Sequence, residues 1–252
     1  MKTSSFAKSW SLSGVILLFA AVGWTRPLPF HPGEKLVYEV RWERIPVAQV
    51  SLEVRPFEKI QGEQAFHFAF RARTYSALDI LYRVDGGIEA FTDLDVTRSL
   101  RLAKDMHEGR SRRVYRVDFD WHRAMATYVS GGGQKRDLVL PEGTLDLLSI
   151  LYYARSLALK EGMVVSRPLC SGKKTLVVSA RVERKESLFL GGQLRPAFLI
   201  VPDIRQAGQI FKKSKRPELL LWISDDEEKI PLKVVGKVWV GAFIAELAAA
   251  SP

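Results

Sequence analysis

Two groups of carboxylates have a spacing that could support chemistry. Asp118 and Asp120 are two residues apart in a segment that alternates as a strand does, so both side chains lie on one face, where a carboxylate pair could do acid/base work or bind a metal. We favour the alternative, a solvated strand face balanced by Arg112 and Arg116, because charged side chains are usually exposed. The acidic run at 225–228 lacks the alternating ligands and central glycine of an EF-hand loop, so we expect a charged hairpin tip there rather than a calcium site.

Signatures of other catalytic sites are missing from the sequence. There is no G-x-S-x-G, H-E-x-x-H or C-x-x-C motif and no complete phosphate-binding loop. The four histidines are scattered, without the spacing that brings two metal ligands together, and we expect His67 to face solvent. Cys170, the single cysteine, lies in an apolar-flanked segment and is expected to be a buried, unreactive thiol. We therefore predict no catalytic residue, no metal site and no cofactor, and an enzyme is the less favoured class of protein.

Two runs of basic residues are candidates for contact with an anion. They are Arg110, Arg112, Arg113 and Arg116, and then Lys212, Lys213, Lys215 and Arg216. Each run could form an anion-facing patch, or it could be a solvated strand edge that discourages aggregation between sheets. The formal net charge of +10 favours anionic surroundings such as phospholipid head groups, lipopolysaccharide or acidic glycans.

Large aromatic side chains stand on the apolar faces of several alternating segments. We predict that some of them line a partly open apolar cleft for an acyl chain, with basic residues at its rim for an anionic head group. The candidates are Tyr38, Trp42, Phe68 and Trp222. A dry, fully packed barrel is an equally weighted alternative, since most aromatic stripes belong to a core.

The elements that must position these residues are mostly strands. Apolar and polar residues alternate with a period of two in many segments, and turn signals such as Gln61-Gly62 and Asp85-Gly86-Gly87 separate them. The segment 144–157 differs, because its apolar residues recur at helical spacing on almost all sides, with Thr144 as candidate N-cap and Asp146 near the positive end of the helix dipole. The predicted fold class is mainly β: an antiparallel meander forming a curved sheet or barrel, with one substantial buried helix.

The N-terminal segment 1–23 is predicted to be a cleavable signal peptide. A short basic region precedes an apolar core at 14–22, and Ala21 and Gly23 supply the small residues before the cut. This core is about half as long as a membrane-spanning helix, which needs roughly 20 apolar residues. We therefore expect residues 24–252 to form a single β-rich domain, periplasmic or otherwise exported, with no membrane span after cleavage. Nucleic acid is not an expected partner of an exported chain that has no recognisable nucleic-acid module.

Three segments together resemble an uncharacterised family of exported bacterial proteins, catalogued as domain of unknown function 3108. They are GEKLVYEVRWERIPVAQVSLEV at 33–54, LDLLSILYYARSLAL at 145–159 and LWISDDEEKIPLKVVGKV at 221–238. The resemblance implies a periplasmic or envelope protein with a β-rich, barrel-like fold. It implies no activity and no catalytic residues, because the family has no assigned function.

These observations favour a non-enzymatic envelope protein that binds an amphipathic or anionic envelope component. One alternative is a hydrolase of envelope polymers with Asp118 and Asp120 as its carboxylate pair. Another is a structural partner of a second envelope protein, docking through a sheet edge. A closed apolar cavity would favour the first class, and a wet cleft with convergent carboxylates the second.

Overall fold

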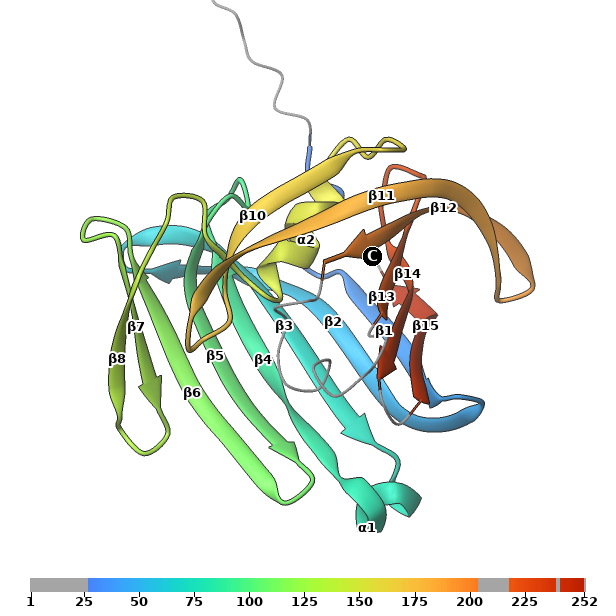
Figure 1. Ribbon diagram of the computed structural model, residues 1–252, viewed down its shortest axis with the longest axis horizontal. Helices are drawn as coiled ribbons and strands as arrows, with labels where there is room; N and C mark the ends of the chain where they lie inside the picture. The colour runs from blue at the N-terminus through green and yellow to red at the C-terminus, as the bar shows by residue number, and fades with distance from the viewer. Residues whose placement is uncertain (1–26, 204–217, 239–240, 252) are drawn as a thin grey trace, which may run out of the picture.

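Strands of one sheet dominate the computed structural model, which describes residues 27–203, 218–238 and 241–251 (Figure 1). The first eight strands are β1 Lys35–Trp42, β2 Ile45–Ile60, β3 Glu63–Thr74, β4 Val84–Thr92, β5 Ser99–Glu108, β6 Ser111–Asp120, β7 Met125–Ser130 and β8 Lys135–Val139. The later ones are β9 Leu145–Asp146, β10 Val164–Cys170, β11 Thr175–Leu190, β12 Gln193–Pro202, β13 Glu218–Ser224, β14 Pro231–Val238 and β15 Gly241–Ser251. The helices are η1 Ser76–Leu78, α1 Asp79–Tyr82 and α2 Ser149–Ser156. The predicted signal peptide and the basic run at 212–216 lie outside the described residues.

The strands follow one another around the sheet in the order of the sequence. Consecutive strands lie side by side except β8 and β9, and the first strand, β1, pairs with the last, β15. The two ends of the sheet are β8 and β9, so the described strands form a curved sheet that is not closed into a barrel. All neighbouring pairs are antiparallel except β9 and β10, which are parallel. The predicted mainly β, curved meander is therefore confirmed, with an open seam between β8 and β9.

Strand alternation gives the sheet an inner face, which is turned toward α2, and an outer face. Leu36, Leu52 and Phe70 stand opposite one another on β1, β2 and β3, and they join the apolar cluster that also contains Tyr152 of α2. Their chain neighbours, such as Lys35, point outward. The period-two pattern thus predicted the faces of Lys35, Leu36 and Tyr38 correctly, because consecutive strand residues point to opposite sides.

The predicted turn at Asp85-Gly86-Gly87 is wrong, because these residues lie inside β4 and pair with β3 and β5 on both sides. Gly86 has a φ of +142°, and a Cβ there would overlap the backbone carbonyl of Asp105. A Cβ on Gly87 would overlap the side chain of Arg71 and lie 2.5 Å from the carbonyl oxygen of Phe70. The two glycines therefore permit close approach within the sheet, which is the second common use of glycine in a strand.

The predicted helix is shorter than the segment 144–157, and the expectation of a substantial helix is wrong. Helix α2 covers only Ser149–Ser156, because Leu145–Asp146 form β9 beside β10. Thr144 does not cap it; instead Asp146 Oδ1 accepts the backbone N–H groups of Leu148 (2.9 Å) and Ser149 (3.0 Å). The expected burial is confirmed for its Tyr152 and Arg155 side chains. None of the described helices is long and apolar enough to cross a membrane.

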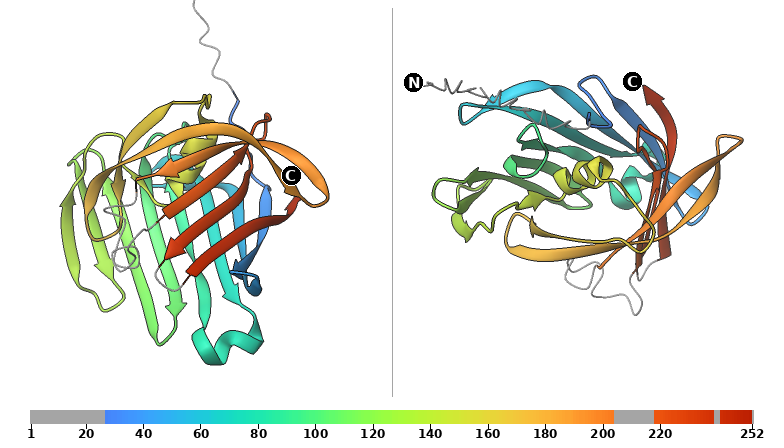
Figure 2. Two further views of the ribbon diagram at one scale, coloured as in Figure 1. Left: turned by 45° about the vertical axis from the view of Figure 1, so that its right-hand side comes forward. Right: turned by 90° about the horizontal axis from the view of Figure 1, so that it is seen from above.

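The helix lies within the curve of the sheet, as the view from above shows (Figure 2). Phe68 of β3 stacks on Tyr152 with ring centroids 3.8 Å apart, and Phe30 packs edge-on against both rings. Arg155 is fully buried beside them and donates to both carboxylate oxygens of Glu34, at 2.6 and 2.7 Å. The helix thereby ties the segment before β1 to the apolar core.

Candidate functional site

Three of the four residues predicted to line an apolar cleft, Tyr38, Phe68 and Trp222, belong to one packed apolar cluster. Tyr38 is buried, and its hydroxyl donates to the carbonyl oxygen of Pro231 at 2.8 Å. Phe68 has no exposed surface and is stacked on Tyr152. Around these two aromatic rings the inner face is filled with protein atoms.

Trp222 joins this cluster from another strand face, whereas Trp42 lies outside it. Trp222 is in a cross-strand row with Lys233, Glu246 and Glu39, so it points to the face opposite Tyr38. It is buried there, with its indole N–H donating to Glu186 at 2.6 Å.

Trp42 stands at the end of β1 and is 41% exposed, opposite Ile45 and Phe243. The structure thus does not bring Tyr38, Trp42, Phe68 and Trp222 together around one cleft. The reason is that strand alternation and position along the strand separate them, although each is aromatic and lies on an alternating segment.

The candidate carboxylate pair is occupied by neighbouring groups. Asp118 accepts from Arg101 with one oxygen and from Arg116 with the other, both at 2.7 Å, and Asp120 accepts the backbone N–H of Arg123 at 3.0 Å. Arg116 thus balances the carboxylate as expected, but the second partner of Asp118 is Arg101, because Arg112 pairs with Asp105 instead.

The acidic run at 225–228 forms the connection between β13 and β14, as expected of a hairpin tip. Asp226 accepts the Ser224 hydroxyl at 2.6 Å and the backbone N–H of Lys229 at 2.9 Å. Cys170 is buried as predicted, and burial raises the pKa of its thiol.

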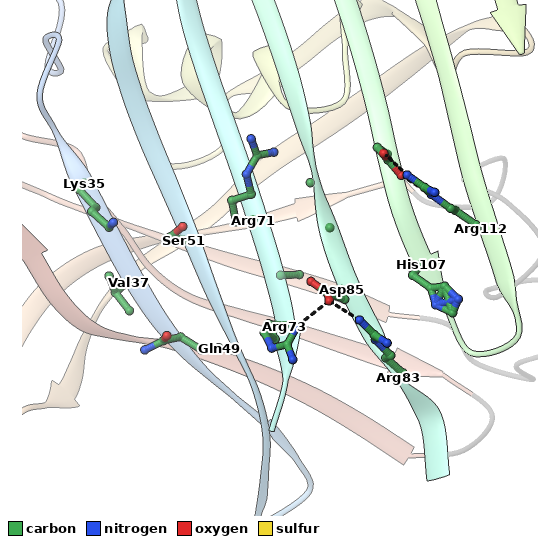
Figure 3. A pocket seen from close by; sticks show the side chains of 14 residues that line it. Lys35, Val37, Gln49, Ser51, Arg71, Arg73, Arg83, Asp85, His107 and Arg112 are labelled. Carbon is green, nitrogen blue, oxygen red and sulfur yellow. Dashed lines mark hydrogen bonds and ion pairs between the residues drawn. The ribbon is translucent and has the colours of Figure 1, made fainter. Parts of the chain in front are cut away.

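A groove of about 870 Å³ crosses the outer face of β1 to β6 (Figure 3). Its lining residues are Lys35, Val37, Gln49, Ser51, Arg71, Ala72, Arg73, Arg83, Asp85, Gly86, Gly87, Asp105, His107 and Arg112. Five of these side chains are cationic and two are carboxylates, so the lining carries an excess of positive charge. We define this surface as the basic groove.

Strand register brings the basic groove together. Ser51, Arg71, Gly87 and Asp105 are direct partners across β2 to β5 and form its central row. A second row runs parallel to the central row, two residues away from it on each strand. It consists of Gln49, Arg73, Asp85, His107 and Arg112. Because the central row contains serine and glycine between larger neighbours, the surface is hollow along it.

The carboxylates of the groove hold its arginines in place. Asp105 accepts two hydrogen bonds from the guanidinium of Arg112, at 2.9 and 2.7 Å. Asp85 accepts from Arg83 and from Arg73, as the dashed lines in Figure 3 show. The hydrogen bond from Arg83, and then that from Arg73, lower the pKa of Asp85. The hydrogen bond from Arg112 lowers the pKa of Asp105 in the same way.

Arg71 is positioned by a second cluster, which contains His67. His67 is buried, contrary to the expectation that it faces solvent; its ring contacts Glu89 and lies 2.8 Å from a carboxylate oxygen of Glu58. Glu89 also accepts from Arg71, whose side chain passes over Gly87. Burial raises the pKa of Glu89, but the hydrogen bonds from His67 and Arg71 outweigh it and lower that pKa to about 2. His67 is buried because these carboxylates and the ring of Phe91, 4.3 Å away, cover it.

A second hollow of about 440 Å³ adjoins the basic groove and shares Arg71, Gly87 and Asp105 with it. It extends toward β7 and is lined in part by Arg116. Only part of the first basic run of the sequence therefore lines these hollows. Arg112 and Arg116 line the two hollows, whereas Arg113 is paired with Met106 of the inner face and Arg110 lies in the β5–β6 turn.

The sequence alone does not distinguish Lys35, Arg71, Arg73 or Arg83 as site residues. Each is a basic residue at a polar position of an alternating segment, and such residues are common on exposed strand faces. Their convergence depends on the register between strands that are far apart in the chain.

These features define a class of protein: an open, barrel-like sheet that wraps a buried helix and carries a basic groove on its outer face. The family model described as "Protein of unknown function (DUF3108)" matches residues 37–248, and the chain belongs to that family. The resemblance found in the sequence is thereby confirmed. No curated protein gives a significant match.

The similar solved structures are remote in sequence. A beta-barrel-like protein of domain of unknown function DUF1849 from Brucella abortus has a TM-score of 0.52 at 10% identity, over 86% of this chain and 96% of its own. This likeness shows a shared barrel-like fold. A candidate lipoprotein from Parabacteroides distasonis has a TM-score of 0.35 at 9% identity, over 89% and 97% of the two chains, and carries no argument.

Proposed function

We propose that this chain is an exported, non-enzymatic binding protein whose basic groove holds an anionic saccharide of the cell envelope. The ligand class comprises acidic glycans and the phosphorylated sugar portion of lipopolysaccharide, which share phosphate or carboxylate groups on a polar chain. The observation that carries the proposal is the lining of the groove, where five cationic side chains face two carboxylates.

The shape of the groove supports an extended polar ligand rather than an acyl chain. It crosses several strands, is lined mainly by polar side chains, and continues into the adjoining hollow. Arginine presents a planar fork of donors that matches phosphate and carboxylate groups. The inner face offers less to an acyl chain, because Tyr38 and Phe68 are packed without exposed surface around them.

The ion pairs that already exist in the groove do not prevent binding. The side chains of Arg73 and Arg112 are 59% and 65% exposed, and solvent-exposed ion pairs contribute only about 0–1 kcal/mol each. A ligand with several anionic groups can therefore replace Asp85 or Asp105 as a partner at little cost. Arg71 differs, because Glu89 holds it over Gly87 and keeps its side chain in the groove.

Export and an envelope partner are part of the same proposal. They are supported by the signal-like segment 1–23 and by the positive formal charge, which favours the anionic components of an envelope. Reaction of the chain with substrate is not proposed, since Asp118 is held by Arg101 and Arg116.

Titration of the purified protein with three saccharides tests this function: lipid-free core oligosaccharide of lipopolysaccharide, polygalacturonate, and neutral dextran. We expect saturable binding of at least one anionic saccharide, weakening as salt screens the charges, and no binding of dextran. The double variant Arg73→Ala/Arg112→Ala should bind roughly tenfold more weakly or worse.

The matched control is Arg181→Ala/Arg184→Ala on β11, where the two side chains are similarly exposed but lie outside the groove. It should bind as the unmodified protein does. Equal losses in both double variants, or no saturable binding of either anionic saccharide, would overturn the proposal.

A further inference from the structure

The end of the β11–β12 hairpin exposes large apolar side chains. Phe189 and Leu194 are direct cross-strand partners, and their exposed fractions are 72% and 70%. Gly191 and Gly192 make the turn beyond them, both with positive φ. Figure 1 shows this hairpin extending beyond the rest of the sheet, and the view from above in Figure 2 shows the same projection.

Folding of the hairpin does not require this exposure. Leu188 and Leu190 alternate with Phe189 and pack against the main apolar cluster. Phe189 and Leu194, on the opposite face, belong to none of the apolar clusters that the described residues form. The segment 187–194 also contains no charged residue, although 26% of the chain is charged. A hairpin end exposed only to water would favour polar residues at these positions.

A second hairpin end has the same character. At the end of β1 and the start of β2, Trp42 and Ile45 are cross-strand partners with exposed fractions of 41% and 55%, and Phe243 of β15 is the other partner of Trp42. In Figure 1 this end reaches the same side of the molecule, at the right, as the β11–β12 hairpin.

Exposed cationic residues lie near both apolar ends. Arg184 and Lys185 precede the β11–β12 end, where they pair with Glu186 and Asp225, and Arg44 is in the β1–β2 turn between Trp42 and Ile45. Apolar side chains flanked by cations are typical of segments that insert shallowly among lipid head groups. Both ends project from the molecule. A deformable bilayer can accommodate such projecting apolar side chains, whereas a protein partner would need a concave pocket of matching shape.

We propose that the protein docks on an anionic lipid bilayer through the β11–β12 and β1–β2 hairpin ends, with Phe189 and Leu194 as the principal inserting side chains. This inference does not rest on the proposed function, because the basic groove contains none of these apolar residues.

Co-sedimentation with vesicles tests the inference. The purified protein should bind vesicles of phosphatidylglycerol and phosphatidylcholine, and bind phosphatidylcholine vesicles more weakly. Phe189→Ser/Leu194→Ser should reduce the partition coefficient roughly tenfold or more, because two buried apolar side chains are lost. The control Val139→Ser/Val177→Ser changes side chains that are 73% and 66% exposed but lie outside both hairpin ends, and it should leave binding unchanged.

A depth measurement makes the test independent of the serine variants. Because Cys170 is buried, a Leu194→Cys variant offers one accessible thiol for an environment-sensitive fluorophore. The label should be quenched by lipids that carry a quencher in their acyl chains, both in this variant and when Arg73→Ala/Arg112→Ala is added. Absence of quenching, or binding of the Phe189→Ser/Leu194→Ser variant within about twofold of the unmodified protein, would overturn the inference. Failure of the unmodified protein to bind either anionic saccharide, with quenching retained, would overturn only the proposed function.

Discussion

Replacement of Arg155 by methionine should strongly destabilise the protein. The buried guanidinium donates to both carboxylate oxygens of Glu34 and also to the carbonyl oxygens of Pro29, Glu228 and Lys229, at 3.2, 3.0 and 3.0 Å. Methionine fills much of the same space but has no donor. The variant therefore leaves one carboxylate and three carbonyl groups in the interior without their partner.

The expected loss follows from the cost of leaving these groups unpaired. Removal of one partner of a buried ion pair typically costs about 3–5 kcal/mol. Each buried carbonyl that loses its donor can add about 1–3 kcal/mol, less where water enters. We expect the free energy of unfolding to fall by at least about 4 kcal/mol. The control is Arg41→Met, which breaks partly exposed ion pairs with Glu39 and Glu246 and should cost about 0–1 kcal/mol for each pair.

Urea unfolding followed by tryptophan fluorescence measures both variants. A loss below about 2 kcal/mol for Arg155→Met, or a loss equal to that of Arg41→Met, would refute the assignment of Arg155 as a buried anchor. The double variant Glu34→Leu/Arg155→Met removes both charges together. It should cost less than the sum of the two single variants, because neither charge is then left unpaired.

Two further changes test the groove and its supporting cluster. Gly87→Ala places a Cβ against Arg71 and the Phe70 carbonyl, so we expect a loss of stability of about 1–3 kcal/mol and weaker saccharide binding; unchanged values in urea unfolding and titration would contradict the geometry. The pKa of Glu89 is lowered from 4.5 to about 2 in the folded protein, so its contribution to stability is complete above pH 4.5 and is lost as the pH falls toward 2. Glu89→Gln should therefore lose stability less steeply over this window, and urea midpoints with the same pH dependence in both proteins would disprove it.

The local sequence pattern was sufficient to predict the features that depend on a single strand. The period of two predicted that Leu36 and Tyr38 are buried while Lys35 points outward, because alternation is a property of a single strand. The burial of Cys170 and the acidic connection at 225–228 were likewise predicted from neighbouring residues. The helix was located but overextended, since pairing of Leu145–Asp146 with β10 competes with helix formation and involves residues distant in the chain.

Other features were decided by contacts between strands. Asp85-Gly86-Gly87 has the composition of a turn, but pairing on both sides keeps it in β4 and makes the glycines the low point of a groove. His67 has a polar position yet is buried, because Glu58, Glu89 and Phe91 cover it.

What the sequence by itself determined is the β class of the chain, the face of each residue within its own strand, and the membership of a family. Only the tertiary structure decided that Arg71, Arg73 and Arg112 converge while Tyr38 and Trp222 point to opposite faces. The physical reason is the register between strands. A shift of one residue between neighbouring strands exchanges the faces, and the hydrophobic periodicity of one strand does not specify which residues of the next strand it pairs with.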